Sequence, residues 1–192
     1  YVKTDPRLFA DVGIPRADNG NYMWIQYFYH YLNDTGRAGF VMASSATDAG
    51  GSEKLIRQKL IEENLLDAVI GLPANLFYGT GIPACVLVIN KNGAAKRKDV
   101  LFINADREFK EGKNQNSLRA EDIEKIAQVY RTRQNLDKYS RVVSFDELEK
   151  EEWNLNIRRY VDNSPPPEPH DVLAHLHGGI PMAEIDSLTD FF

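Results

Sequence analysis

This chain is predicted to have an α/β fold, with helices on the faces of a sheet. Short apolar runs at 38–43, 66–72 and 84–89 are typical of buried strands, and segments with helical spacing of apolar residues alternate with them. The number of elements is also informative, because three or four strands with two helices make only half of a doubly wound sheet. The unpaired backbone groups along the cut edge of such a sheet would need a covering partner.

The N-terminal part of the chain predicts a loop, a helix and a strand. After a loop over 1–18, Asn19 or Asn21 is expected to cap a helix over about 21–33. The apolar residues of this helix fall on one face, which we expect to be buried; they are Trp24, Ile25, Phe28 and Leu32. The run 38–43 is then expected to be a buried strand of a parallel sheet, followed by a loop of small residues.

The remaining elements follow the same reasoning. Ser52 is expected to cap a second helix that buries Leu55, Ile56 and Leu60. Pro73 ends the strand at 66–72, and the strand at 84–89 comes next. Apolar spacing further predicts a strand at 100–103, a helix at 120–133 and a short strand at 141–145. The prolines between 165 and 169 predict an extended linker, so the expected units are a domain over 1–162 and a linker with a short C-terminal extension over 163–192.

The composition excludes several classes of protein. Of the 192 residues 43% are hydrophobic and 27% charged, which excludes global disorder. No apolar run approaches the roughly 20 residues that span a bilayer, so no membrane partner is expected. The single cysteine, Cys85, excludes a disulfide framework and suits a reducing cytoplasm. Since the chain begins with Tyr1 and no signal peptide follows, we expect it to be a fragment of a longer protein.

Common catalytic motifs are absent from the sequence. There is no G-x-G-x-x-G after a strand, no phosphate-binding G-x-x-x-x-G-K-[ST] and no G-x-S-x-G. The histidines of the tail, His170, His175 and His177, have a spacing that binds metal weakly at best. A solvated tail is the favoured interpretation, and no metal site is predicted.

Charge is distributed unevenly along the chain. The net charge of −5 gives no overall attraction to nucleic acid. Between Lys91 and Arg133, however, eleven Lys and Arg residues stand against seven Asp and Glu residues. This stretch is either a DNA-facing strip or a solvated surface of mixed charge, which is the commoner case. The candidates for contacts with a DNA backbone are Lys96, Arg97, Lys98, Lys110 and Lys113.

The loop Leu76–Pro83 carries the most distinctive pattern in the sequence. Two adjacent aromatic residues, Phe77 and Tyr78, precede Gly79-Thr80-Gly81, whose glycines allow a sharp turn and a close approach to a ligand. At the end of a sheet these rings would be able to clamp a flat ring, and stacking of a base on an aromatic ring is worth roughly 1–3 kcal/mol. The alternative, that both rings fold under the loop as core, is slightly favoured on physical grounds alone.

Several segments over about 20–161 resemble the modification subunit of type I restriction-modification systems. The most specific is Leu72-Pro73-x-Asn75-Leu76-Phe77-Tyr78-x-Thr80-x-Ile82-Pro83, and 20–26, 36–42, 53–57 and 154–160 also match. The resemblance implies a Rossmann-like, doubly wound methyltransferase sheet with an antiparallel strand near one edge. The strands at 66–72 and 84–89 would form that antiparallel edge hairpin.

The resemblance also implies an activity: adenine-N6 DNA methylation with S-adenosylmethionine as the methyl donor. The target adenine would be flipped out of the duplex, with Phe77 as the first choice for stacking on it and Tyr78 as the second. The loop around that base would include Asn75, Gly79, Thr80, Gly81 and Pro83. With the resemblance, the functional interpretation of the loop becomes the favoured one.

Two parts of the family pattern are not found in the sequence. The glycine-rich cofactor loop and the Asn-Pro-Pro-aromatic tetrapeptide, which binds the adenine amino group, would precede Tyr1. We therefore expect this chain alone to be inactive and to bind no cofactor. The implied partners are double-stranded DNA, a specificity subunit, a nuclease subunit and the N-terminal half of the same domain. The alternative function is a non-catalytic assembly or DNA-binding module of a restriction complex.

Overall fold

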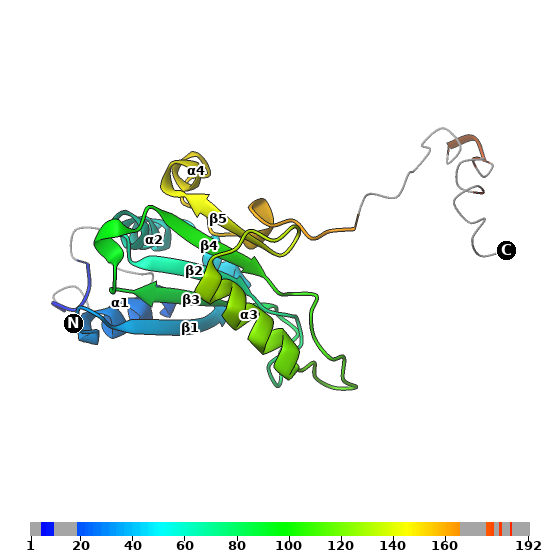
Figure 1. The fold of residues 1–192 in the computed structure, drawn as a ribbon, viewed down its shortest axis with the longest axis horizontal. Helices are drawn as coiled ribbons and strands as arrows, with labels where there is room; N and C mark the ends of the chain where they lie inside the picture. The colour runs from blue at the N-terminus through cyan, green and yellow to red at the C-terminus, as the bar shows by residue number, and fades with distance from the viewer. Residues whose placement is uncertain (1–4, 10–18, 166–175, 179–180, 182–184, 186–192) are drawn as a thin grey trace.

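The computed structural model describes residues 5–9, 19–165, 176–178, 181 and 185, in which five strands form one mixed sheet (Figure 1). The strands lie in the order β1-β3-β2-β4-β5. Along the chain they are β1 (Arg37–Ala43), β2 (Leu66–Gly71), β3 (Ala84–Asn90), β4 (Asp99–Asn104) and β5 (Ser140–Ser144). Strand β2 is antiparallel to β3 and parallel to β4. The predicted α/β class and the antiparallel pairing of β2 with β3 are thus confirmed.

The first strand differs from the prediction. Strand β1 is antiparallel to its single neighbour β3 and forms one edge of the sheet. Only Met42 of its seven residues is buried. The expectation of a buried strand in a parallel sheet at 38–43 was wrong, because β3 lies between β1 and β2 and leaves β1 with one neighbour. The expected antiparallel pair, β2 with β3, therefore lies inside the sheet, and β1 is the edge strand beyond β3.

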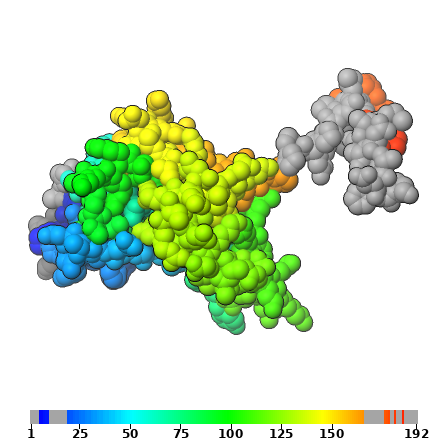
Figure 2. All heavy atoms as spheres, in the orientation of Figure 1, coloured from blue at the N-terminus to red at the C-terminus, as the bar shows by residue number. Residues whose placement is uncertain are grey.

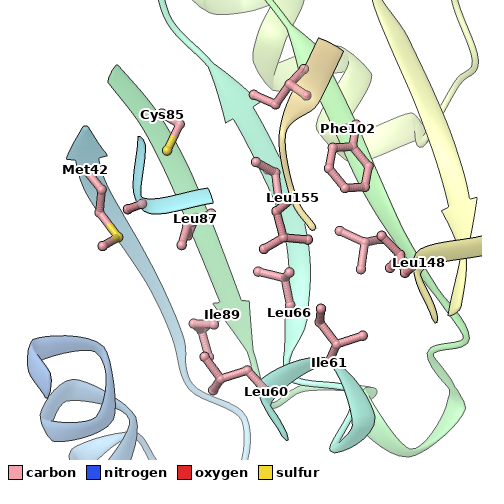
Figure 3. Close-up of a cluster of buried hydrophobic side chains, with 14 of the residues drawn as sticks. Met42, Leu60, Ile61, Leu66, Cys85, Leu87, Ile89, Phe102, Leu148 and Leu155 are labelled. Atoms are coloured by element: carbon pink, nitrogen blue, oxygen red, sulfur yellow. The ribbon is translucent and has the colours of Figure 1, made fainter. Parts of the chain in front are cut away.

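Helices cover the two faces of the sheet unequally. Helices α1 (Asn21–Tyr31), α2 (Ser52–Glu62) and α4 (Phe145–Lys150) contribute side chains to one hydrophobic cluster, and α3 (Ala120–Thr132) contributes to a second one. In Figure 3, the first cluster lies between β-strands and helices, with Leu87, Leu66 and Phe102 on neighbouring strands facing Leu60, Ile61 and Leu148. No helix among the described residues is long and apolar enough to cross a membrane.

The buried faces of α1 and α2 are narrower than predicted. Trp24 and Phe28 are 58% and 56% exposed, and Leu55 of α2 is 48% exposed. Ile25 of the predicted face is buried as expected, and α1 also buries Tyr22 and Gln26. The prediction of a buried Trp24–Phe28 face was wrong because α1 packs beside the edge strand β1, where no further strand covers it. The predicted caps differ by one residue, since Gly20 and Gly51 occupy the N-cap positions.

Candidate functional site

A cavity of about 490 Å³ lies at the end of the sheet where β1, β2 and β4 finish. We call this end the site end and the cavity the strand-end cavity. Its lining includes Ser44 after β1, Gly71 at the end of β2 and Asn104 at the end of β4. The volume lies within the range of small-molecule sites, and the carboxyl ends of parallel strands are the usual place for such sites in α/β folds.

The loop after β1 forms one wall of the cavity and is anchored from behind. The Tyr22 hydroxyl donates to the Ala46 carbonyl oxygen over 2.7 Å, and burial raises the pKa of Tyr22, so it remains a donor at neutral pH. Arg57, which is buried, donates to the Ala49 carbonyl oxygen over 2.9 Å. These bonds fix the loop that carries Ser44 and Ser45, both of which line the cavity.

The segment 154–163 forms the opposite wall. Asn104 donates through Nδ2 to the Val161 carbonyl oxygen over 3.0 Å. Asp106 accepts hydrogen bonds from Arg158 over 3.2 Å and from Asn163 over 2.6 Å. A Cβ atom at Gly71 would lie only 2.9 Å from Cδ1 of Ile157, so a glycine lets this wall approach the sheet closely.

The predicted aromatic loop, Leu76–Pro83, projects beside the cavity. Ala74 and Pro83 on either side of it line the cavity. Phe77 is 40% and Tyr78 92% exposed, and neither belongs to a hydrophobic cluster, whereas Leu76 packs against the second one. Asn75 has φ of 54° and Gly79 of 78°, and these two turns direct the rings outward. Among the described residues the two rings are therefore not core, which removes the packing alternative within this chain.

The five predicted DNA-backbone residues fall at two places. Lys110 and Lys113 are exposed on a projecting segment at the site end, where Figure 2 shows the green segment around 110 and the teal aromatic loop protruding on the same side. Lys96, Arg97 and Lys98 immediately precede β4 and lie at the other end of the sheet. At ~3.3 Å per residue, a six-residue strand separates the two places by roughly 20 Å.

Arg97 does not fit the role predicted for it. Its side chain is 8% exposed and pairs with Asp67 over 3.3 Å. Its guanidinium also donates to the carbonyl oxygens of Asn64, Asn90 and Asn92. An arginine that is engaged in this way is not available to a phosphate group.

Sequence reasoning missed one basic residue at the site end. Arg107 lines the strand-end cavity and is exposed, and no hydrogen bond or ion pair joins its side chain to another described residue. In the sequence it is one of the eleven basic residues of the mixed-charge stretch between Lys91 and Arg133. Its position directly after β4 is the signal that would have singled it out.

Two further candidate groups can be placed. Burial raises the pKa of Cys85 to about 12, so this residue is an inert thiol under the sheet and not a nucleophile. No three potential metal ligands come together in the described part of the chain. Of the tail histidines, His170 and His175 lie outside the described residues, as do most of the predicted proline linker and the loop over 10–18.

Comparison with known proteins identifies the class to which this arrangement belongs. A family model described as N-6 DNA Methylase matches residues 1–168. The chain therefore belongs to the N-6 DNA methylase family, whose members are DNA N6-methyltransferases.

Within that class, the chain is similar to methylase subunits of type I restriction enzymes. It is 38% identical over 164 residues to the MjaVIII methylase subunit of Methanocaldococcus jannaschii, covering 83% of this chain and 28% of that protein. It is 31% identical to the HindI methylase subunit of Haemophilus influenzae, covering 94% and 40%. A solved methyltransferase subunit of a type I system from Streptococcus thermophilus matches with a TM-score of 0.78 at 38% identity, covering 82% of this chain and 33% of that one. The predicted family is confirmed, and the chain spans about a third of the length of these relatives.

Proposed function

We propose that this chain forms the target-base side of an adenine-N6 DNA methyltransferase, as part of the modification subunit of a type I restriction-modification system. The observation that carries the proposal is the pair Phe77 and Tyr78, whose rings are exposed on a loop beside the strand-end cavity. Enzymes that modify a base inside a duplex extrude it into a pocket and hold its face against aromatic side chains. The exposed rings and the adjacent cavity match these two requirements.

In this proposal the aromatic ring and the cavity do different work. Phe77 stacks on the extruded adenine, which offsets part of the cost of unstacking by roughly 1–3 kcal/mol. Tyr78 is the second candidate for this contact. Asn75, Gly79, Thr80, Gly81 and Pro83 shape the loop that carries both rings. Ser44, Ser45 and Asn156 line the cavity and are the polar residues proposed to orient the base edge.

The described residues do not fit a complete binding site for S-adenosylmethionine, the methyl donor of this class of enzyme. The loop that leads from β1 through Gly50 and Gly51 into α2 does not carry the G-x-G-x-x-G pattern, and neither glycine lines the strand-end cavity. Asp106 holds one wall of the cavity through its hydrogen bonds from Arg158 and Asn163, and the sequence has no Asn-Pro-Pro-aromatic tetrapeptide that would bind the adenine amino group. No step of methyl transfer is therefore assigned to this chain, and the proposal includes that it is inactive by itself.

We place the missing functions in another part of the same subunit. Support comes from the free edge of β1, which is flanked by the exposed apolar side chains of Trp24, Phe28 and Val41. An unpaired edge beside apolar surface is a site for pairing with a further strand. Residues 1–162 would then be the C-terminal half of the catalytic domain, and 163–192 the start of an extension toward the specificity and nuclease subunits.

Double-stranded DNA is the proposed substrate, and Lys110 and Lys113 are its preferred backbone contacts. Both lie at the site end with the aromatic loop. Lys96 and Lys98 are exposed at the opposite end, where they are too far away to accompany base contact by Phe77. Arg97 is withdrawn from this set because it pairs with Asp67.

Replacing Phe77 by alanine in the complete subunit, assembled with its specificity subunit, tests the proposal. We expect the rate of adenine methylation to fall by roughly 10- to 100-fold, which corresponds to the loss of one stacking contact. The melting temperature should change little, since Phe77 is outside both cores. Ile82→Ala is the matched control, because Ile82 is an exposed apolar residue of the same loop. Unchanged methylation by Phe77→Ala, or a large loss of stability with unchanged methylation, would overturn the proposal.

A second measurement separates the proposal from the alternative of a non-catalytic assembly module. The complete subunit should bind S-adenosylmethionine, and this chain by itself should not. If the isolated chain bound the cofactor with micromolar affinity, the assignment of the cofactor site to another segment would be wrong. If the complete subunit bound DNA but no cofactor, the assembly module would be the better description.

A further inference from the structure

The base of the aromatic loop is held by a second projecting segment, the arm Lys110–Ser117. The two ends of the arm pair with each other, since the Lys110 amide donates to the Ser117 carbonyl oxygen over 2.8 Å and the reverse bond is 3.0 Å long. The turn of the arm requires a glycine, because a Cβ atom at Gly112 would lie 2.1 Å from the Gln115 carbonyl oxygen. The arm is therefore a defined substructure, not an unconstrained connection between β4 and α3.

Two residues of the arm bind three consecutive carbonyl groups at the start of the aromatic loop. The Asn116 amide N–H donates to the Asn75 carbonyl oxygen over 2.8 Å, and its Nδ2 donates to the Ala74 carbonyl oxygen over 2.9 Å. Gln115 Nε2 donates to the Leu76 carbonyl oxygen over 2.7 Å. These bonds join parts of the chain about forty residues apart, directly before the position of Phe77.

The aromatic loop has few other constraints among the described residues. Its far end is attached to the loop after β1, where the Ser44 amide donates to the Pro83 carbonyl oxygen over 3.0 Å. Between the two attachment points its backbone makes only local hydrogen bonds among the described residues, from the Thr80 amide to the Phe77 carbonyl oxygen and from the Ile82 amide to the Thr80 hydroxyl. Its residues from Phe77 to Pro83 are exposed. A loop with so few contacts depends on its attachment points for a fixed direction.

We propose that Asn116 and Gln115 are positioning residues that fix the direction of the aromatic loop relative to the basic arm. This inference rests on the proposed function, because it takes Phe77 as the base contact. The arm carries Lys110 and Lys113, so the same three hydrogen bonds set the spacing between the phosphate contacts and the ring. Phosphate contacts fix the register of a protein on DNA, and the bonds from Asn116 and Gln115 transmit that register to Phe77.

Fixing the direction of the aromatic loop has two expected advantages, one for the rate of reaction and one for the free energy of binding. A group that must meet an extruded base loses efficiency steeply with misplacement, of the order of 100-fold for about 1 Å. Fixing the loop before DNA binds also removes the ordering entropy that a free loop would lose in the complex. The loop's own aromatic ring supplies the contact, and the arm supplies its orientation.

The test is Asn116→Ala in the complete subunit bound to its specificity subunit, with a duplex that carries 2-aminopurine at the target adenine. We expect the single-turnover rate of methylation on the normal duplex to fall by roughly 10- to 100-fold. The fluorescence rise of 2-aminopurine on binding should be reduced, while the Kd for the duplex stays within about twofold. Asn116→Ala removes the bond from Nδ2 to Ala74 and the bond that Oδ1 accepts from the Gly112 amide within the arm, while the backbone bond to Asn75 remains. Gln115→Ala removes one bond to the loop from an exposed side chain and leaves the bonds within the arm intact, so it should give a smaller loss in the same direction.

Asn114→Ala is the matched control. Asn114 is an exposed asparagine of the same arm whose side chain has no hydrogen-bond partner among the described residues and no role in the proposal. Its rate and fluorescence should equal those of the wild type. If Asn116→Ala and Gln115→Ala also behave as the wild type, the positioning role is wrong. A Kd that rises in parallel with the loss of rate would equally overturn it, since the residues would then act in DNA affinity.

The result for Phe77→Ala distinguishes a failure of the proposed base contact from a failure of the positioning role. A slow Phe77→Ala with a normal Asn116→Ala would leave the proposed function intact and refute only the positioning role. A normal Phe77→Ala would refute the proposed base contact itself, whatever Asn116→Ala does. A melting temperature measured for each variant distinguishes a misdirected loop from a destabilised protein, and Gln115→Ala decides the matter if Asn116→Ala is unstable.

Discussion

The two ends of the sheet use polar residues in opposite ways. At the end where β2 and β4 begin, which we call the closed end, polar groups satisfy one another. Asp67 is 8% exposed and accepts hydrogen bonds from Asn90, Tyr130 and Arg133 over 2.8, 2.6 and 2.8 Å. Arg97, in the turn before β4, completes the network at 3.3 Å. The network joins β2, β3 and α3, and the Asp67 carboxylate is occupied by these four partners.

At the site end, by contrast, one charged and two aromatic side chains are exposed and are not bound to one another. Phe77 and Tyr78 are exposed beside a cavity that Arg107 lines, and no hydrogen bond or ion pair joins the Arg107 side chain to another described residue. Exposed apolar side chains that gather next to polar groups mark surfaces that contact another molecule. If the proposed function is correct, the groups that stabilise the sheet and those that bind the substrate lie at opposite ends of the same strands. A change at one end should therefore leave the property of the other end nearly unaltered.

The largest expected effect is on stability and comes from Asp67→Ala at the closed end. Removing the carboxylate leaves Arg97 and Arg133 without their buried partner, and breaking such a pair typically costs about 3–5 kcal/mol. Thermal unfolding of the complete subunit should show a drop of several degrees in melting temperature. Asp99→Ala is the control, since Asp99 is 38% exposed and pairs with Arg133 alone. It should cost less than about 1 kcal/mol, and an equal loss from both variants would contradict the distinction.

A smaller effect is expected on DNA affinity, and it should come from the site end alone. Lys110→Ala with Lys113→Ala should weaken binding of the duplex by roughly tenfold and reduce the salt dependence of log Kd by about two units. Lys96→Ala with Lys98→Ala removes the same charge at the closed end and should change neither quantity. Titrations at several salt concentrations measure both slopes. Equal losses from the two pairs would mean that DNA runs along the whole sheet, against the comparison.

The fold was predictable wherever a pattern was local. Continuous apolar runs marked β2, β3 and β4, because a strand buried on both faces carries that information in its own residues. The spacing of apolar residues with a period of 3.6 marked α3, which packs only one face against the sheet. The exposure of Trp24 and Phe28 was not predictable. Whether an apolar helical face is buried depends on what pairs with β1 at the edge of the sheet, and no residue of α1 encodes that.

The residues of the candidate site were likewise predictable from the sequence only where their role depends on local properties. The aromatic loop could be found from Phe77 and the glycines that follow it, since ring chemistry and backbone freedom are local properties. Asn116 and Arg97 could not be assigned from sequence. One binds a carbonyl group about forty residues away and the other a carboxylate thirty residues away. Polar residues in loops have many possible partners, and the fold alone selects between a phosphate group and an internal acceptor.

The smallest expected effect is a dependence of stability on pH that arises at the closed end. Burial by itself would raise the pKa of Asp67, but hydrogen bonds from Tyr130 and Asn90 and the charges of Arg97 and Arg133 lower it on balance below its ordinary value of 3.8. A carboxyl group with a lowered pKa in the folded state stabilises the protein above its unfolded pKa. That contribution is lost as the pH falls through the folded value.

Tyr130, which donates a hydrogen bond to Asp67, sets the upper pH limit of this contribution to stability. Burial, with the hydrogen bond to Asp67, raises the pKa of Tyr130 to about 12, so this contribution is present below the ordinary value of 10 and lost as the pH rises toward 12. The difference in melting temperature between wild type and Asp67→Asn should thus be constant from about pH 5 to pH 9 and narrow below about pH 4. Melting curves over this range measure it. A difference that stayed constant down to pH 3 would show that the Asp67 network does not depend on its charge, and the closed end would then owe its stability to packing and not to paired polar groups.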